Sequence, residues 1–299
     1  MTDWTSLCIA VVAGDEREQE IARLAAAEGA EVRAFGFPWP EDGIAGVTRV
    51  DSIEAALTGA HYALFPIPGI GADGSLFAPE HPRPIVPTPD ALARMAPGAA
   101  VILGVGDANL RAAAGPHGIT LDEYEGDKEL MLLRAPAIVE GALRTAVEHT
   151  DVTIHAAAVV VVGFGTIGAL LARTLRALGA DVTVAARNPE QRASAYAMGA
   201  TPLPLADLPE ASGRFQMVFS TVPAPVIGRE VLERLPTGAL MMDLAAPPGG
   251  VDLELAQALG HRAVWARGLG RRAPVTVGRS QWGGIRRRIE ASESWKVNA

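Results

Sequence analysis

The sequence predicts an α/β protein with two parallel-sheet domains, and three observations lead to this class. Residues 159–168 read VVVVGFGTIG, which is an apolar strand, a glycine-rich turn and the start of a helix. Short apolar segments typical of buried strands alternate with helical segments along the rest of the chain. Hydrophobic residues make up 49% of the 299 residues and aromatic residues only 5%, a composition that suits such layers better than a β-sandwich.

The N-terminal part contains five predicted strands separated by four predicted helices. The strands are residues 7–12, 31–35, 61–65, 100–103 and 118–121, and the helices are residues 16–28, 53–57, 89–95 and 109–114. Residues 69–86 are rich in Gly and Pro and predict a long loop, of a kind that often carries function. This alternation is typical of a flavodoxin-like or Rossmann-like domain, which we place at residues 1–126 and expect to bind the substrate.

A connecting segment, residues 127–150, predicts one long helix or a kinked pair, because Pro136 would bend or break a helix. Its polar residues Lys128, Arg134 and Glu140 either line a cleft between the domains or form an ordinary solvated helix face.

The second domain, residues 151–275, contains five more predicted strands. They are residues 159–162, 181–185, 215–220, 239–244 and 262–265, with helices at residues 169–178, 189–198 and 252–259. Residues 267–272, RGLGRR, form a basic loop. The C-terminal segment, residues 276–299, contains a predicted helix at residues 278–290 that we expect to return to the first domain.

The glycine-rich turn indicates a dinucleotide site. Gly163 permits the tight turn, Gly165 lets backbone N–H groups approach a pyrophosphate, and Gly168 lets the helix pack close to the strand. The N-terminus of the following helix adds unpaired N–H donors and a partial positive charge. The alternative is a tight strand-to-helix turn without a ligand. The residues predicted to contact the cofactor here are Gly163, Phe164, Gly165, Thr166, Ile167 and Gly168.

The end of the next strand favours NADP over NAD. Dinucleotide domains usually place a carboxylate there to bind the ribose 2′-hydroxyl, whereas this chain has Arg187 and Asn188. A guanidinium pairs with a 2′-phosphate, which a carboxylate would repel. The alternative for Arg187 is a surface arginine in a turn. Two later strand ends are expected near the nicotinamide, and their residues are Thr221, Val222, Pro223, Asp243, Leu244 and Ala245.

Composition excludes several other classes of protein. The net charge of −8 argues against nucleic acid or an anionic membrane surface as a partner. The single cysteine, Cys8, cannot form an internal disulfide, and no Cys/His cluster indicates zinc. Without a secretion signal or an apolar run of about 18 residues, a cytoplasmic protein is expected.

With these landmarks placed, the chain resembles the family of the dipicolinate synthase A subunit, of spore-forming bacteria, over nearly its whole length. The most specific match is residues 243–252, DLAAPPGGVD, which resemble the family's DLAxxPGGxD. Further matches are Gly14-Asp15-Glu16-Arg17 to its GDxR turn and Thr153-Ile154-His155 to its TIH segment, with Glu140-Gly141 to its EG pair. The chain departs from the family motifs at Arg134, Ala137, Ile138 and Val275, where the family has Asn, Pro, Thr and Lys.

The resemblance implies the oxidation of 4-hydroxy-tetrahydrodipicolinate to dipicolinate, with loss of water and hydride transfer to NADP. It also implies a second, flavoprotein-like B subunit as partner, and we expect a homo-oligomer. The dicarboxylate substrate needs cationic anchors and a base. The candidate anchors are Arg17, Arg134 and Arg271, and the candidate bases or orienting groups are Asp15, Glu140, His155 and Asp243.

Each of these residues also has a structural alternative. Asp15 can cap the first helix, Arg17 can lie on its outer face, and His155 can be a structural histidine before a strand. Glu140 can pair with Arg144 on a helix surface, and Asp243 can cap the turn before Pro247.

Three hypotheses therefore follow. The first is an oxidoreductase of the dipicolinate synthase type. The second is an NADP oxidoreductase for a related anionic substrate, which the departures favour. The third is a cofactor-binding subunit of a two-subunit enzyme that has no turnover of its own.

Overall fold

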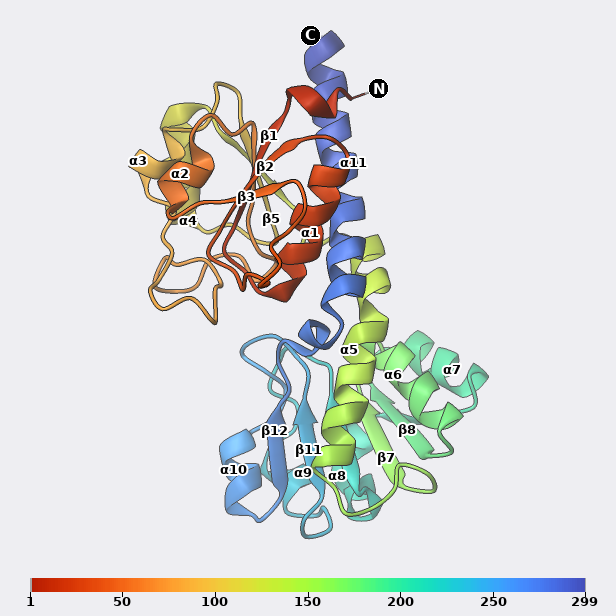
Figure 1. The fold of residues 1–299 in the computed structure, drawn as a ribbon. Coiled ribbons are helices and arrows are strands. Elements are labelled where there is room, and N and C mark those ends of the chain that lie inside the picture. The colour runs from red at the N-terminus through yellow and green to blue at the C-terminus, as the bar shows by residue number, and fades with distance from the viewer. Residues whose placement is uncertain (1, 299) are drawn as a thin grey trace. The chain divides into compact units, whose positions relative to one another are not determined.

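The structure, a computed structural model, describes residues 2–298 and divides into two compact units (Figure 1). The first unit contains residues up to 134 together with the C-terminal residues from 273, and the second contains residues 135–272. Each unit is an α/β layer structure around one parallel sheet, which confirms the predicted fold class.

The sheet of the first unit has six parallel strands in the order β3-β2-β1-β4-β5-β6. The strands are β1 (Cys8–Val12), β2 (Glu31–Phe35), β3 (Val47–Arg49), β4 (Tyr62–Leu64), β5 (Ala100–Leu103) and β6 (Thr120–Glu123). The helices are α1 (Glu16–Ala27), α2 (Ile53–Leu57), α3 (Pro89–Leu92) and α4 (Ala108–Ala114), with 3-10 turns η1 (Trp4–Ser6) and η2 (Gly115–His117).

The sheet of the second unit also has six parallel strands, in the order β12-β11-β10-β7-β8-β9. The strands are β7 (Ala158–Val162), β8 (Asp181–Ala186), β9 (Thr201–Pro204), β10 (Met217–Ser220), β11 (Leu240–Asp243) and β12 (Arg262–Trp265). The helices are α6 (Thr166–Ala177), α7 (Pro189–Ala197), α8 (Leu208–Ala211), α9 (Arg229–Leu232) and α10 (Leu253–Ala258), with 3-10 turns η3 (Leu205–Asp207), η4 (Ser212–Arg214) and η5 (Leu269–Arg272).

Both sheets therefore share one connectivity. Numbered within its own unit, each sheet runs 3-2-1-4-5-6, the order of a dinucleotide-binding fold. In such a sheet, the carboxyl ends of the strands on either side of the point where the order reverses form the ligand-binding edge. That edge follows β1 and β4 in the first unit and β7 and β10 in the second.

Two strands were absent from the sequence-based expectation. Both β3 and β9 lie at a sheet edge, and they contain three and four residues. Their patterns, Val-Thr-Arg and Thr-Pro-Leu-Pro, carry little apolar periodicity because an edge strand buries little of itself.

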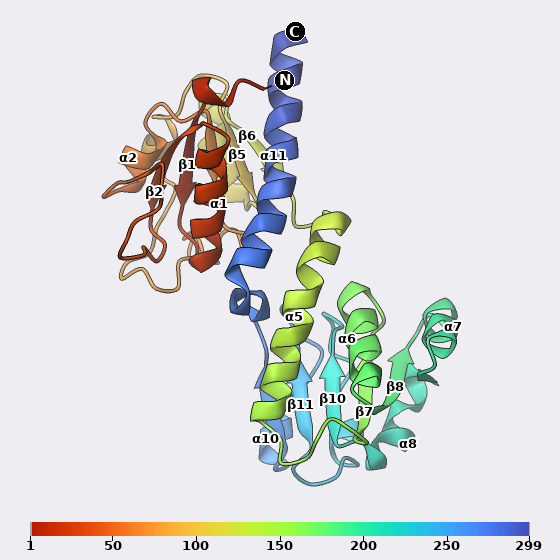
Figure 2. The ribbon, with the colours of Figure 1, turned by 45° about the vertical axis from the view of Figure 1, so that its right-hand side comes forward.

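The C-terminal helix α11 (Pro274–Asn298) packs on α1 within the first unit, as expected (Figure 2). It begins at Pro274, earlier than the predicted residue 278. Trp282 lies 5.7 Å from Trp4 between ring centroids, and Ile285 and Ile289 are completely buried in the same core. This helix therefore supplies an apolar stripe to the first unit and is part of its hydrophobic core.

The connecting segment forms one helix, α5 (Lys128–Glu148), with Pro136 inside it. The division between the two units falls within this helix, between Arg134 and Ala135. Among the described residues, no helix is long and apolar enough to cross a membrane.

Candidate active site

The glycine-rich turn borders a cavity of about 320 Å³ at the carboxyl edge of the second unit's sheet. Its lining comes from the turns that follow β7, β8, β9 and β10, from the last residues of β8 and from the first turn of α7. These residues are Gly163, Phe164, Gly165, Ala185, Ala186, Arg187, Asn188, Gln191, Leu205, Thr221, Val222 and Pro223. The sequence predicted most of this set but missed Ala185, Ala186, Gln191 and Leu205, since none of these residues was assigned to a cofactor motif.

The geometry of Gly163 and Gly168 fits the turn and the close packing expected of them, and Gly165 borders open space. Gly163 has a φ of 94°, a left-handed conformation that favours glycine. A Cβ atom on Gly168 would lie 2.3 Å from the Gly163 carbonyl oxygen, so the helix could not pack this closely with a side chain there. A Cβ atom on Gly165 would meet nothing within 4 Å. The protein leaves open space beside Gly165, where the ligand is expected.

The N-terminus of α6 carries no side-chain cap. Gly165 is the N-cap residue and cannot accept a hydrogen bond from the first turn through a side chain. Thr166 and Ile167 begin the helix. The first N–H groups and the helix dipole are thus directed to the open space at the turn, which is the arrangement that binds phosphate groups.

Arg187 follows β8 and lines the same cavity with an exposed side chain. Its guanidinium makes no hydrogen bond or ion pair with residues 2–296, whose side chains the structure describes. The Arg192 guanidinium donates to the carbonyl oxygens of Ala186, at 2.9 Å, and of Arg187, at 2.7 Å, and so holds this turn. Asn188 caps α7 by accepting from the Glu190 N–H at 2.8 Å.

The loop after β10 lines the cavity, whereas the loop after β11 does not. Thr221 donates its hydroxyl to the Val162 carbonyl at 3.0 Å, which ties the loop after β10 to the strand that leads into the glycine turn. Leu244 and Ala245 follow β11 and do not line the cavity described above.

Asp243 holds the loop that follows its own strand. Its buried carboxylate accepts hydrogen bonds from the N–H groups of Ala245 at 3.0 Å, Gly250 at 2.6 Å and Val251 at 3.2 Å. Both oxygens are occupied by the DLAAPPGG loop. These contacts are the structural alternative for Asp243, and its role as a base stays a prediction.

His155 lies at the opposite edge of the sheet. It precedes β7, at the amino ends of the strands, and its Nδ1 lies 3.3 Å from the Leu178 carbonyl oxygen. The cavity lies at the carboxyl ends, so the expectation that His155 is catalytic is corrected by its position in the sheet. Its contacts are those of a structural histidine.

Glu140 lies on α5 with an exposed side chain and pairs with Arg272 from η5, not with Arg144. Gly141 allows α5 and η5 to approach each other closely, because a Cβ atom there would lie 2.9 Å from the Leu269 carbonyl oxygen. The EG pair therefore joins α5 to the basic loop within the second unit. Arg271 lies on the same 3-10 turn and is half-buried.

In the first unit, Asp15 and Arg17 form a buried pair at the start of α1. The Arg17 Nε and Nη2 atoms donate to the two Asp15 carboxylate oxygens at 2.7 and 2.8 Å, and the Arg17 N–H also donates to Asp15. Asp15 is therefore the helix cap, and its partner Arg17 is turned inward, not along the outer face of the helix. Both Asp15 oxygens accept hydrogen bonds from Arg17, and the expectation that Asp15 is a base stays a prediction.

Glu18 is a functional candidate that the sequence reasoning missed. Its Oε2 accepts from the Asp15 N–H at 2.7 Å, while Oε1 is buried and has no partner within the described part of the chain. Burial raises the pKa of the Glu18 carboxyl to about 7, against a smaller opposing effect of the Arg17 charge. The Asp-x-x-Glu spacing of a capping box was present in the sequence and could have identified it.

Other buried polar groups lie near Glu18. Burial raises the pKa of the Tyr124 phenol, whose oxygen lies 3.5 Å from the Gln281 Nε2 atom. Arg134 is buried and donates to Glu125 at 3.0 Å, while its Nε has no partner among residues 2–296, whose side chains the structure describes. Tyr124 interacts electrostatically with both Arg17 and Arg134, so the structure brings these two predicted anchors around one buried phenol.

The second unit fits a nicotinamide dinucleotide on structural grounds. It combines an uncapped helix N-terminus, open space beside Gly165 and an arginine at the end of the second strand. The helix N-terminus suits the pyrophosphate, and the open space lets the pyrophosphate approach the backbone closely. The arginine suits an anionic substituent on the ribose.

Comparisons with known protein families match each half of the chain separately. Residues 8–124 match the model of the N-terminal domain of the dipicolinate synthase A subunit. Residues 144–261 match the model of the shikimate / quinate 5-dehydrogenase family.

A curated relative and solved structures extend the match to nearly the whole chain. The dipicolinate synthase A subunit of Bacillus subtilis is 30% identical over 275 residues, which cover 92% of this chain and 93% of that protein. The crystal structure of the B. subtilis protein has a TM-score of 0.83 at 28% identity and covers 96% of this chain and 97% of that one. The structure of the Bacillus halodurans A subunit has a TM-score of 0.86 at 28% identity, with coverages of 95% and 98%.

A transhydrogenase from Sinorhizobium meliloti shares the fold at lower identity. Its TM-score is 0.74 at 18% identity, and the match covers 96% of this chain and 94% of that one. This likeness extends to the fold alone.

Proposed function

The chain belongs to the family of the dipicolinate synthase A subunit, and from this premise we propose that it oxidises 4-hydroxy-tetrahydrodipicolinate to dipicolinate with NADP. Family membership and the dehydrogenase-type second half support the coarser statement that it is an oxidoreductase linked to a nicotinamide cofactor. The observation that carries the proposal is the 30% identity over 92% of the chain, because it includes both units and not only the cofactor half.

The proposed reaction divides between cofactor and protein. The substrate loses water and two hydrogens, one as a hydride and one as a proton, and an aromatic pyridine dicarboxylate remains. A bound nicotinamide cofactor supplies the hydride acceptor. The protein must hold two carboxylates, exclude water and accept the proton.

The choice of NADP rests on Arg187. Its guanidinium lines the cavity at the end of β8 and makes no hydrogen bond or ion pair with the described part of the protein. A 2′-phosphate offers it a charge-assisted, bidentate partner, whereas the 2′-hydroxyl of NAD does not. We therefore assign Arg187 to the 2′-phosphate and the N-terminus of α6 to the pyrophosphate.

For the substrate, Arg134 is the anchor that the contacts favour. Its buried Nε lacks a partner among the described side chains of residues 2–296, so a substrate carboxylate would satisfy a donor that is otherwise costly to bury. The Arg17 Nε and Nη2 atoms both donate to the Asp15 carboxylate, so Arg17 serves to hold the turn at the start of α1. Arg271 and Glu140 remain candidates as an anchor and an orienting group.

For the proton, Glu18 replaces Asp15 as the base that we propose. A carboxyl with a pKa of about 7 exchanges protons near neutral pH, as a general base must. Its unpartnered Oε1 is the atom available for this exchange.

A second candidate function is the oxidation of a related anionic substrate with the same cofactor. The observation that favours it is the change of family motif residues to Arg134, Ile138 and Val275. A flavoprotein-like B subunit is the partner that we propose, since the name of the curated relative marks it as one subunit of a larger enzyme.

The test is an assay of the full chain with 4-hydroxy-tetrahydrodipicolinate and NADP, with and without the partner subunit. We expect formation of dipicolinate in step with the absorbance of the reduced cofactor. Turnover with other cyclic dicarboxylates, but not with this substrate, would favour the second candidate. No turnover of any of them with the partner present would leave only the role of a non-catalytic subunit.

A further inference from the structure

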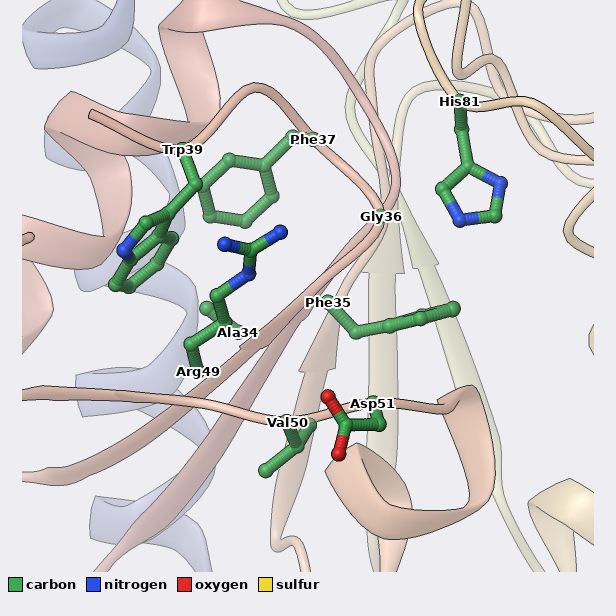
Figure 3. Close-up of a pocket in the computed structure, with 9 residues that line it drawn as sticks. All are labelled: Ala34, Phe35, Gly36, Phe37, Trp39, Arg49, Val50, Asp51 and His81. Carbon is green, nitrogen blue, oxygen red and sulfur yellow. The ribbon is translucent and has the colours of Figure 1, made fainter. Parts of the chain in front are cut away.

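A second cavity, of about 210 Å³, lies at the carboxyl ends of β2 and β3 in the first unit (Figure 3). Aromatic rings form much of its wall. Phe35 and His81 meet edge to face with centroids 5.4 Å apart, and Phe37 and Trp39 are tilted at 6.1 Å. Such a wall offers flat apolar faces to a planar ring.

Polar groups border the same cavity. The Arg49 guanidinium lies 5.7 Å from the centroid of the Trp39 ring, and Asp51 follows two residues later. Neither side chain makes a hydrogen bond or ion pair with residues whose side chains the structure describes. His81 uses Nδ1 toward Arg83, which leaves Nε2 for another partner. The cavity thus combines aromatic faces with a donor and an acceptor.

The position of this cavity matches that of the cofactor cavity in the other unit. Both sheets run 3-2-1-4-5-6, and both cavities are lined from the ends of the second and third strands. By strand register Phe37 corresponds to Arg187, and Asp51 and Leu205 both follow the third strand of their unit. His81 and Val222 both come from the loop that follows the fourth strand. In a sheet of this order, that position receives the adenosine part of a dinucleotide.

The two cavities differ at the turn after the first strand. In the second unit this turn is open at Gly165, whereas in the first unit the Asp15 carboxylate caps the helix. A Cβ atom on Gly14 would lie 2.2 Å from the Glu18 Cδ atom, so that turn is already filled. A phosphate would meet a buried carboxylate there, which repels it.

We propose that the first unit binds a purine nucleoside without phosphate groups, such as adenosine, in this cavity. The base lies between the aromatic side chains, Arg49 donates to acceptor atoms of the base, and Asp51 accepts from the ribose hydroxyls. Asp51 also disfavours an anionic aromatic acid. The volume, smaller than the 320 Å³ of the cofactor cavity, suits one nucleoside better than two linked nucleotides.

The test is a calorimetric titration of the full chain with adenosine while the cofactor site is saturated with NADP. We expect one adenosine to bind per chain, and AMP to bind no more tightly than adenosine. Asp51→Asn and Trp39→Ala should each raise the Kd for adenosine about tenfold, since each removes one main contact. Asp42→Asn, an exposed acid in the same segment that does not line the cavity, should leave the Kd unchanged.

Two results would overturn the proposal. One is the absence of adenosine binding to the NADP-saturated chain. The other is adenosine binding that NADP displaces and Arg187→Asp weakens, while Asp51→Asn has no effect, because adenosine would then occupy the cofactor cavity. Circular dichroism and Tm of each variant check that it is folded. Neither result bears on turnover, so the proposed function is tested separately.

Discussion

At the scale of single residues, Arg187 carries the cofactor preference that we propose. Arg187→Asp should weaken NADP binding by roughly 2 kcal/mol, about thirtyfold, because a charge-assisted pair is lost and a repulsion gained. NAD binding should change little. Calorimetry with both cofactors measures this, and Arg173→Asp, an equal charge change on an exposed position of α6, is the control. An equal loss for NADP and NAD would refute the assignment.

Substitution of Asp243 distinguishes a structural role of this residue from a catalytic one. Asp243→Asn removes at least one of three hydrogen bonds to the loop after β11, so the free energy of unfolding should fall by roughly 2 kcal/mol. Denaturant unfolding measures it. Asp252→Asn, which affects one cap bond at Leu255, should cost less, about 0.5 kcal/mol. Unchanged stability together with lost turnover would return Asp243 to the role of base.

Glu18 makes stability depend on pH. Its folded pKa, about 7, lies above the ordinary value of 4.5, so folding favours the protonated carboxyl. This contribution is complete below pH 4.5 and is lost as pH rises through about 7. Across that window, the unfolding free energy of Glu18→Gln should gain roughly 3 kcal/mol relative to the unsubstituted chain.

Urea unfolding at a series of pH values measures the Glu18 effect. Glu41→Gln, at an exposed position, is the matched control and should follow the unsubstituted chain at every pH. A constant difference between Glu18→Gln and the unsubstituted chain would show that Glu18 does not titrate in this window.

At the scale of elements, two glycines of the turn between β7 and α6 have different roles: we expect Gly165 to serve ligand binding and Gly168 to serve helix packing. Gly165→Ala should fold normally, since its Cβ meets nothing within 4 Å, but it should weaken NADP binding at least about tenfold by intruding on the ligand's space. Gly168→Ala should instead destabilise the fold, by roughly 1–3 kcal/mol, because its Cβ would lie 2.3 Å from a carbonyl oxygen. Thermal unfolding and NADP titration of both variants distinguish the two effects, and the reverse pattern would contradict the assignment.

Elements with strong apolar periodicity were predictable from the sequence. The edge strands of the sheets and the burial of individual polar side chains were not. The turn at residues 163–168 and the central strands follow from local pattern. The short edge strands β3 and β9 do not, because they bury little. The capping box of Asp15 and Glu18 is a local pattern, but the burial of Arg17 and Glu18 depends on the elements that pack around α1, among them α11, which no local pattern encodes.

At the scale of the whole molecule, one strand order occurs twice with different chemistry. The second unit keeps an open glycine turn and an arginine for an anionic cofactor, whereas the first fills its turn with Asp15, Arg17 and Glu18. The alternation of strands and helices predicted both sheets. The glycine pattern of residues 163–168 predicted which unit has the open turn, whereas the filling of the other turn by Asp15, Arg17 and Glu18 became visible only with the side chains in place.

The central claim is that this chain moves a hydride from the dicarboxylate ring to NADP. The most direct measurement uses 4-hydroxy-tetrahydrodipicolinate deuterated at its ring carbons, incubated with the chain, NADP and the partner subunit, followed by mass spectrometry of the cofactor. The account predicts reduced NADP that carries one deuterium, together with dipicolinate. Dipicolinate formed while the cofactor stays oxidised, or reduced NADP without deuterium, would contradict it.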